Sequence, residues 1–268
     1  MSRLSLSISI ALAALTLAAR HPAQAQTSIQ FQDNGVALAA TQAAGVIPTT
    51  HYNILNGASG TSGFLLDNAG SGTTITATYS APGHYYSLAD YSSPTAGSPN
   101  NDLMSAYLDG DNINYPVVTI SGLDAAKSYS VYAYFNSDHV GSSAGQSDRI
   151  AQYTIGTTTF TANLQPGSAF NANGANGGFI AAVGNSASPG VANYALFSNV
   201  VGPSFILSAQ ALTSGDQFRR ASIDGLQIFT NEASAAPEPS QLAGLAFTGL
   251  GAFGLVLKAR KRRSAVQA

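Results

Sequence analysis

The chain has 268 residues, of which only 9% are charged, and it contains no cysteine and no tryptophan. The absence of cysteine excludes disulfides and thiolate metal sites, so packing alone must stabilise any fold. Seven of the eleven cations lie near the two ends, and the stretch 26–236 has four cations against twelve carboxylates, a formal charge of −8. Such an acidic stretch disfavours nucleic acid and anionic lipid, because both require concentrated Lys and Arg.

The N-terminus has the pattern of a signal peptide. Arg3 precedes an apolar run over 4–19, and Ala23 and Ala25 supply small residues at the spacing that signal peptidase requires. We expect signal peptidase to cleave after Ala25. The sequence therefore predicts that the signal peptide 1–25 directs export across the bacterial inner membrane.

Alternation of apolar and polar residues dominates the region that follows. In 73–79 the apolar positions are Ile75, Ala77 and Tyr79, and 129–135 shows the same period of two, which is typical of half-buried strands. We predict further strands over the short runs 28–32, 52–55, 117–121, 151–155, 157–161, 194–197, 204–209 and 223–230.

The connections between these runs are rich in turn-forming residues, as in 56–63 and 92–101. Gly156 separates two predicted strands and indicates a tight hairpin or a bulge. The Gly- and Asn-rich stretch 166–190 predicts a long exposed loop. Many short strands without an amphipathic helix predict an all-β fold, a single antiparallel β-sandwich over 26–232, followed by a linker over 233–236.

Three of these segments resemble the jelly-roll sandwiches of the galactose-binding and carbohydrate-binding type. They are the strand and turn 117–123, the strand 129–135 and the last strand 223–228. The resemblance implies a jelly-roll-like sandwich and an affinity for carbohydrate. Because one fold hosts many functions, it predicts the architecture more firmly than the ligand.

The candidate ligand-binding residues are aromatic or cationic. Aromatic faces with polar edges suit sugar rings, although tyrosines on alternate positions also pack within sandwiches. Two arginines just before the last strand are candidates for pairing with a ligand or with neighbouring aspartates. The full set is Tyr85, Tyr86, Tyr91, Tyr107, Tyr115, Arg219 and Arg220.

A cluster of acidic and amide residues in the same region offers oxygen ligands of the kind that calcium prefers. The cluster lacks the full pattern of an EF-hand. Asp-Gly and Asn are also turn formers, so a turn is the alternative interpretation. The candidate metal ligands are Asn101, Asp102, Asp109, Asp111 and Asn112.

Catalytic motifs are scarce. The two glutamates, Glu232 and Glu238, lie beside or within the C-terminal segment, and no Gly-x-Ser-x-Gly elbow occurs. Glycoside hydrolysis uses two carboxylates about 5 to 10 Å apart, which here would have to be aspartates. We therefore predict that the protein is not an enzyme.

The C-terminal segment begins with Pro237, Glu238 and Pro239. An uncharged run over 240–257 follows, and then five cations over 258–263. Eighteen helical residues span about 27 Å, enough to cross a bilayer, and the cations favour a cytoplasmic end. We predict a transmembrane helix over 240–257.

These three parts together, 237–263, resemble the PEP-CTERM sorting signals. The resemblance implies a Gram-negative source, recognition of the triplet by an exosortase, and processing of an inner-membrane precursor for the cell surface or extracellular matrix. We therefore expect an exported, non-catalytic protein that binds extracellular polysaccharide. A structural or adhesive role in a biofilm matrix is the first alternative, and a hydrolase or lyase acting on glycans through aspartates is the second.

Overall fold

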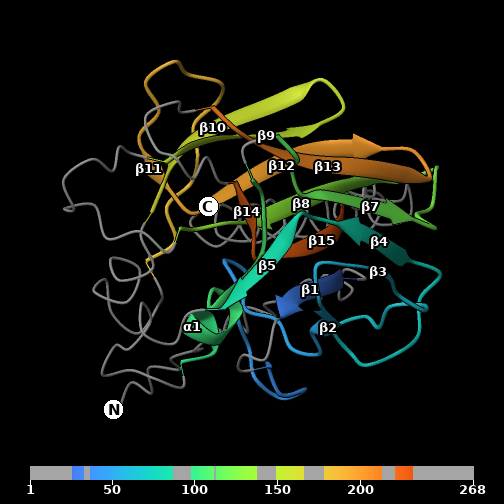
Figure 1. Ribbon diagram of the computed structural model, residues 1–268. Coiled ribbons are helices and arrows are strands. Elements are labelled where there is room, and N and C mark those ends of the chain that lie inside the picture. The colour runs from blue at the N-terminus through green and yellow to red at the C-terminus, as the bar shows by residue number, and fades with distance from the viewer. Residues whose placement is uncertain are drawn as a thin grey trace, which may run out of the picture.

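The computed structural model describes residues 26–32, 37–86, 98–111, 113–137, 149–165, 178–212 and 221–231. Within these residues the protein is an all-β sandwich, as the alternation predicted (Figure 1). No helix among them is long and apolar enough to span a membrane. The predicted signal peptide 1–25, linker 233–236 and transmembrane helix 240–257 lie outside the described residues.

One sheet has five strands. In spatial order they are β12 (Tyr194–Val201), β8 (Ser128–Tyr134), β15 (Gly225–Asn231), β1 (Gln26–Gln32) and β2 (Asn53–Asn56). All neighbours are antiparallel except β1 and β2. β1 therefore lies inside the sheet although it is the first strand in sequence.

The second sheet has seven strands and the third has three. The seven are β11 (Val191–Ala192), β10 (Thr158–Leu164), β9 (Ile150–Ile155), β13 (Ser204–Ala211), β7 (Val117–Ser121), β4 (Thr76–Ser80) and β3 (Ser59–Thr61). The three are β14 (Ser222–Ile223), β6 (Ala106–Asp109) and β5 (Gly83–Tyr86). A short helix, α1 (Pro99–Leu103), precedes β6.

The core lies between the two larger sheets. Alternate residues of β8, such as Val131 and Ala133, pack with Val118 and Ile120 of β7 and with Leu207 of β13, all fully buried. Tyr129, Val131, Ala133 and Phe135 are all buried, which confirms the predicted face of that strand. Burying this apolar set is what stabilises a chain that has no covalent cross-links.

Several predicted boundaries were wrong. The strand expected over 73–79 starts only at Thr76, and the one expected over 223–230 is divided by Asp224 into β14 and β15. Strand β3 lies within 56–63 and α1 begins within 92–101, both expected to be turns. Strands β5, β6 and β11 were not predicted, because four residues or fewer do not establish a period.

The hairpin predicted at Gly156 is confirmed. Gly156 has a φ of +58° and connects Ile155 to its cross-strand partner Thr158. A positive φ at the first central residue suits glycine in a two-residue hairpin. Of the predicted loop 166–190, the described part, 178–190, has no strand, and residues 183–188 are exposed.

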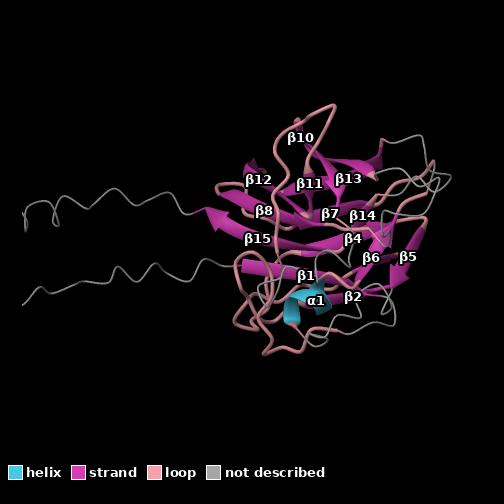
Figure 2. Cartoon of the chain, turned by 90° about the vertical axis from the view of Figure 1, so that its left-hand side faces the viewer, coloured by secondary structure: helices cyan, strands magenta, loops and turns pink. Residues whose placement is uncertain are grey.

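The ends of the sandwich differ. β1 begins and β15 ends at one end, on the left in Figure 2, whereas β5 and β6 lie at the other. The pairing of Gln26 with Phe229 agrees with this arrangement, because it places the first residue of β1 beside the last residues of β15. We call these the terminal end and the distal end.

Candidate functional site

The predicted tyrosines gather partly at the distal end. Tyr85 on β5 pairs with Tyr107 on β6, and their ring centroids lie 5.6 Å apart. Tyr107 is buried, whereas Tyr85 and Tyr86 are half-buried on an edge strand. Tyr115 packs against the core, and Tyr91 lies outside the described residues. Two phenol rings of the predicted five therefore lie on an accessible strand.

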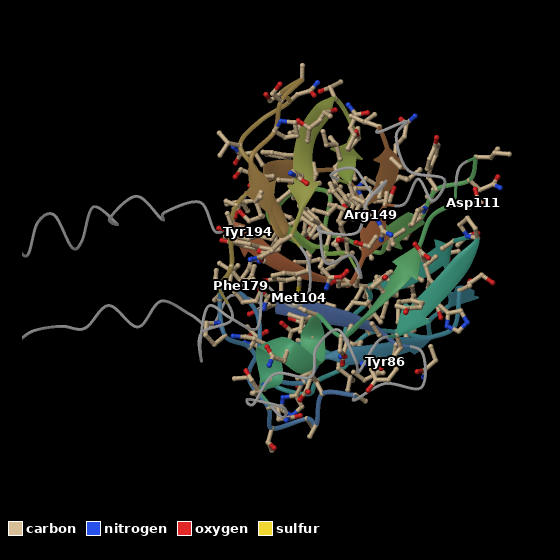
Figure 3. The ribbon with its side chains drawn as sticks, turned by 60° about the vertical axis from the view of Figure 1, so that its left-hand side comes forward. Tyr86, Met104, Asp111, Arg149, Phe179 and Tyr194 are labelled. Carbon is tan, nitrogen blue, oxygen red and sulfur yellow. The ribbon has the colours of Figure 1, made fainter. Side chains whose placement is uncertain are left out.

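Tyr86 lies near one of the predicted metal ligands. Burial raises the pKa of Tyr86, and the negative charge of Asp102 raises this pKa further. Asp102 itself is buried on α1, and burial raises the pKa of its carboxyl group. Figure 3 shows Tyr86 away from Tyr194 and Phe179, so it belongs to a different part of the surface from those aromatic residues.

The predicted acidic cluster has mainly structural contacts. Asp111 accepts hydrogen bonds from the backbone N–H groups of Ile113 at 2.7 Å and Asn114 at 2.6 Å, and these bonds lower the pKa of its carboxyl group. Asn101 and Asp109 are buried on α1 and β6. The contacts of Asp111 match the alternative interpretation as a turn.

The described residues contain no group of three or more His, Asp or Glu side chains arranged to hold a metal ion. Asn112, Arg219 and Arg220 lie outside the part of the chain that the structure describes. The calcium site therefore stays a prediction.

Two adjoining hollows occupy the terminal end. The first has a volume of about 510 Å³ and lies between the β9–β10 and β12–β13 hairpins, with Thr157, Ser198 and Asn199 among its polar groups. The second has a volume of about 670 Å³ and is lined by Lys127, Ser128 and Asn231 among others. Both include Asn199 and Val201, so we treat them as one feature, the end groove.

A β-bulge places Asn199 between the two hollows. The register of β12 on β8 shifts between Phe197 and Val200, and Asn199 has a φ of +59°. Asparagine tolerates this left-handed conformation better than most residues other than glycine. Within the described residues, the amide of Asn199 has no hydrogen-bond partner. The bulge therefore presents a free amide at the centre of the groove.

The groove combines this amide with apolar surface. Val201 is 67% exposed and Ile206 is 56% exposed, while Phe205 is buried beneath them. Asn231 accepts a hydrogen bond from Ser130 Oγ at 2.7 Å, which leaves its NH₂ group without an acceptor among the described residues. The groove can thus offer amide donors and acceptors beside apolar side chains.

The sequence prediction missed this groove because its candidate ligand-binding residues were tyrosines, two arginines and a cluster of acidic and amide residues elsewhere in the sequence. The available signal was the polar pair Ser198 and Asn199, which interrupts the apolar run from Ala195 to Val201. Such an interruption within a strand indicates a bulge. Only the cross-strand pairing shows that Lys127 and Asn231 lie beside it.

These features define an all-β domain with an open, mixed polar and apolar groove. No protein-family model matches the chain, and no curated protein matches it. Two solved structures are similar to it, each with a TM-score of 0.43: the plant receptor-like kinase ANX1, at 16% identity over 76% of this chain, and the ANXUR1 extracellular domain from Arabidopsis thaliana, at 14% identity over 77%. The match covers 48% of each of those chains, so this chain spans about half of their length.

Proposed function

We propose that this protein is an exported, non-catalytic domain that binds extracellular polysaccharide in the end groove. The observation that carries the proposal is the uncharged first hollow, where amide and hydroxyl groups lie beside exposed Val201 and Ile206. A sugar ring likewise combines hydroxyl edges with apolar C–H faces. Pockets of several hundred Å³ with a few polar groups on an apolar surface are typical of small-molecule sites.

The shape of the groove favours a chain of sugars over a single one. The two hollows adjoin along β12 and share Asn199 and Val201, so a ligand that fills both must pass over these two residues. An extended polymer with repeated rings can do this. The described lining of the groove has one cation, Lys127, whereas an extended nucleic acid requires concentrated Lys and Arg.

The residues that line the groove support binding without catalysis. Those that the structure describes include no carboxylate and no histidine, whereas glycoside hydrolysis requires a pair of carboxylates. Asp224 is fully buried, and its hydrogen-bond partner is the amide of Asn136 rather than a second carboxylate. We therefore assign no general acid or base to this domain.

The proposal includes the export route. We infer that signal peptidase releases the chain after Ala25, and that an exosortase then acts at Pro237 to Pro239 on a precursor in the inner membrane. The position of β1 supports the first step, because Gln26, the residue directly after the predicted cleavage site, is a buried strand residue. The jelly-roll-like arrangement implied by the sequence fits a domain of this class.

The test is binding of the full-length chain to a glycan array, in a polyoxyethylene detergent that carries no sugar headgroup, with and without calcium. Asn199→Gly removes the amide and keeps the φ of +59° accessible, so it should abolish retention without unfolding the protein. Thr78→Ala, on the exposed face of β4, is the matched control and should bind like wild type. No retention of any glycan by wild type, in either condition, would refute the proposal.

A further inference from the structure

Lys127 is the cation of the end groove. It lies in the turn between β7 and β8, where its backbone N–H donates to the carbonyl of Asp124 at 3.1 Å. Its side chain is exposed and lines the second hollow. Among the described residues that line the groove, it is the one cation.

The Lys127 ammonium group has no ion pair among the described residues. The nearest acid in sequence, Asp124, is held in the turn, where its Oδ1 accepts the backbone N–H of Ala126 at 3.0 Å. Asp124 does not line either hollow, and every other side chain that lines them, among the residues that the structure describes, is uncharged. An unpaired cation in a strongly acidic domain therefore faces the groove.

Cross-strand pairing brings amide donors to the same place. Asn231 of β15 pairs with Ser128 of β8, and Ser128 pairs on its other side with Val201 of β12. Because paired residues lie about 5 Å apart, Asn231 and Val201 flank the strand that begins one residue after Lys127. Lys127 and the NH₂ group of Asn231, which has no acceptor among the described residues, thus both contribute hydrogen-bond donors to the second hollow.

We propose that the end groove selects glycans that carry a carboxylate, such as chains of uronic acids, with Lys127 and Asn231 as the donors to that carboxylate. This inference rests on the proposed polysaccharide binding and names the class of polymer. The first hollow, which is uncharged, takes the sugar ring next to the acidic one. Hydrogen bonds between a cation and a carboxylate are stronger than neutral ones, so the charge contributes to selectivity.

The test compares an oligogalacturonate with its methyl ester, because esterification removes the charge of the carboxyl group and adds only a methyl group. We expect the full-length chain to bind the acid about two- to fivefold more tightly at low salt, the range for a solvent-accessible charge pair. Raising the salt to about 0.5 M should narrow this difference, since exposed charges are screened at that ionic strength.

Variants of Lys127 separate the groove from the basic segment 258–263, which also attracts acidic polymers. Lys127→Met should reduce the preference for the acid to the part that 258–263 contributes and leave binding of the ester unchanged, while Lys127→Arg should retain the wild-type preference. The contribution of 258–263 is the same in all three proteins. A Lys127→Met variant that keeps the wild-type preference for the acid would overturn the inference.

The outcomes also distinguish this inference from the function on which it rests. If wild type binds acid and ester equally, the polysaccharide-binding function stands and the selection for carboxylates is wrong. If wild type binds neither these probes nor any glycan of the array, the proposed function itself fails.

Discussion

Asp224 is a carboxylic acid at the centre of the sandwich, and it should make the stability of the protein depend on pH. The side chain is fully buried, and desolvation raises the pKa of its carboxyl group well above the usual value. Its Oδ2 accepts a hydrogen bond from Asn136 Nδ2, whereas Oδ1 has no partner among the described residues. The folded protein therefore favours the neutral form of Asp224 more strongly than the unfolded chain does.

The sign of the effect follows from proton linkage. Because the folded state binds this proton more tightly than the unfolded state, the stabilisation is complete below about pH 4 and is lost as the pH rises toward the folded pKa. Each pH unit in this interval lowers the free energy of unfolding by at most about 1.4 kcal/mol. Asp224→Asn should remove this dependence and be more stable than wild type at pH 7. Denaturant unfolding between pH 4 and pH 8 measures both.

The Asn side chain suits the site, because its Oδ1 can accept the hydrogen bond from Asn136 Nδ2 that Asp224 Oδ2 accepts in wild type. Asp111→Asn is the control: Asp111 is exposed, and its pKa is lowered, so its contribution has the opposite sign and is lost on acidification. That variant should keep the wild-type slope above pH 4. An Asp224→Asn protein with an unchanged slope would contradict the assignment.

At the scale of the elements, the turn that follows β7 depends on the size of one residue. Gly122 has a φ of +82°, and a Cβ atom there would lie 2.0 Å from the carbonyl oxygen of Thr74. Gly57 has a nearly identical φ of +85°, but nothing lies within 4 Å of its Cβ position. Substitution of Gly57 therefore measures backbone strain alone, whereas substitution of Gly122 adds steric overlap to a similar strain.

Gly57→Ala should lower the free energy of unfolding by about 1 kcal/mol, the cost of a left-handed alanine. Gly122→Ala should cost at least about 2 kcal/mol more, because the overlap involves backbone atoms of Thr74 and Ile75, directly before β4, and not the end of a flexible side chain. Chemical denaturation of both variants measures the difference. Equal losses would mean that the turn after β7 relaxes freely.

The segment 37–52 covers the outer face of the five-stranded sheet and is held there by a buried polar network. Tyr134 accepts the backbone N–H of Val46 at 2.8 Å and donates to Gln227 Oε1. The Nε2 atom of Gln227 donates to Thr49 Oγ1 and to the carbonyl of Ile47, each at 2.8 Å. Polar contacts therefore account for much of the attachment of this segment.

Tyr134→Phe should cost about 1 to 3 kcal/mol, because it leaves the Val46 N–H and Gln227 Oε1 buried without this partner. Amide hydrogen exchange should accelerate within 44–49. Tyr52→Phe is the matched control: it removes a donor to the Ala44 carbonyl, which also accepts the N–H of Thr49 at 3.0 Å, so the loss should be smaller. A larger loss for Tyr52→Phe would reverse this ranking.

The strands with a clear period were predicted well, because alternation is a local property. The strand 117–121 has the predicted bounds, and β8 differs from its prediction by one residue at each end. The groove was not predictable, because it arises where Ser128 pairs with both Asn231 and Val201, from three distant parts of the sequence. The register between paired strands determines which residues of a sandwich lie side by side at a site. The sequence of a single strand does not contain this register.

At the scale of the whole molecule, the groove and the end of the last strand lie together. Thr230 and Asn231 line the second hollow, and β1 begins at the same end of the sandwich (Figure 2). The proposed sorting triplet, Pro237 to Pro239, follows Asn231 by only six residues. Six extended residues span at most about 20 Å, so any attachment made at the triplet would hold the groove close to it.

Replacing Pro237, Glu238 and Pro239 together by alanine should therefore change where the protein resides. Proline fixes φ and disfavours helix in the residue before it, so the triplet should keep the predicted span 240–257 from extending toward the domain, whereas three alanines would favour helix there. We expect the variant to stay in the inner membrane with its C-terminal segment intact. Cell fractionation and the mass of the processed protein measure this, and Ser240→Ala should be processed like wild type. Unchanged release of the triple variant would exclude recognition of the triplet by an exosortase. Polysaccharide binding by the groove does not depend on that outcome.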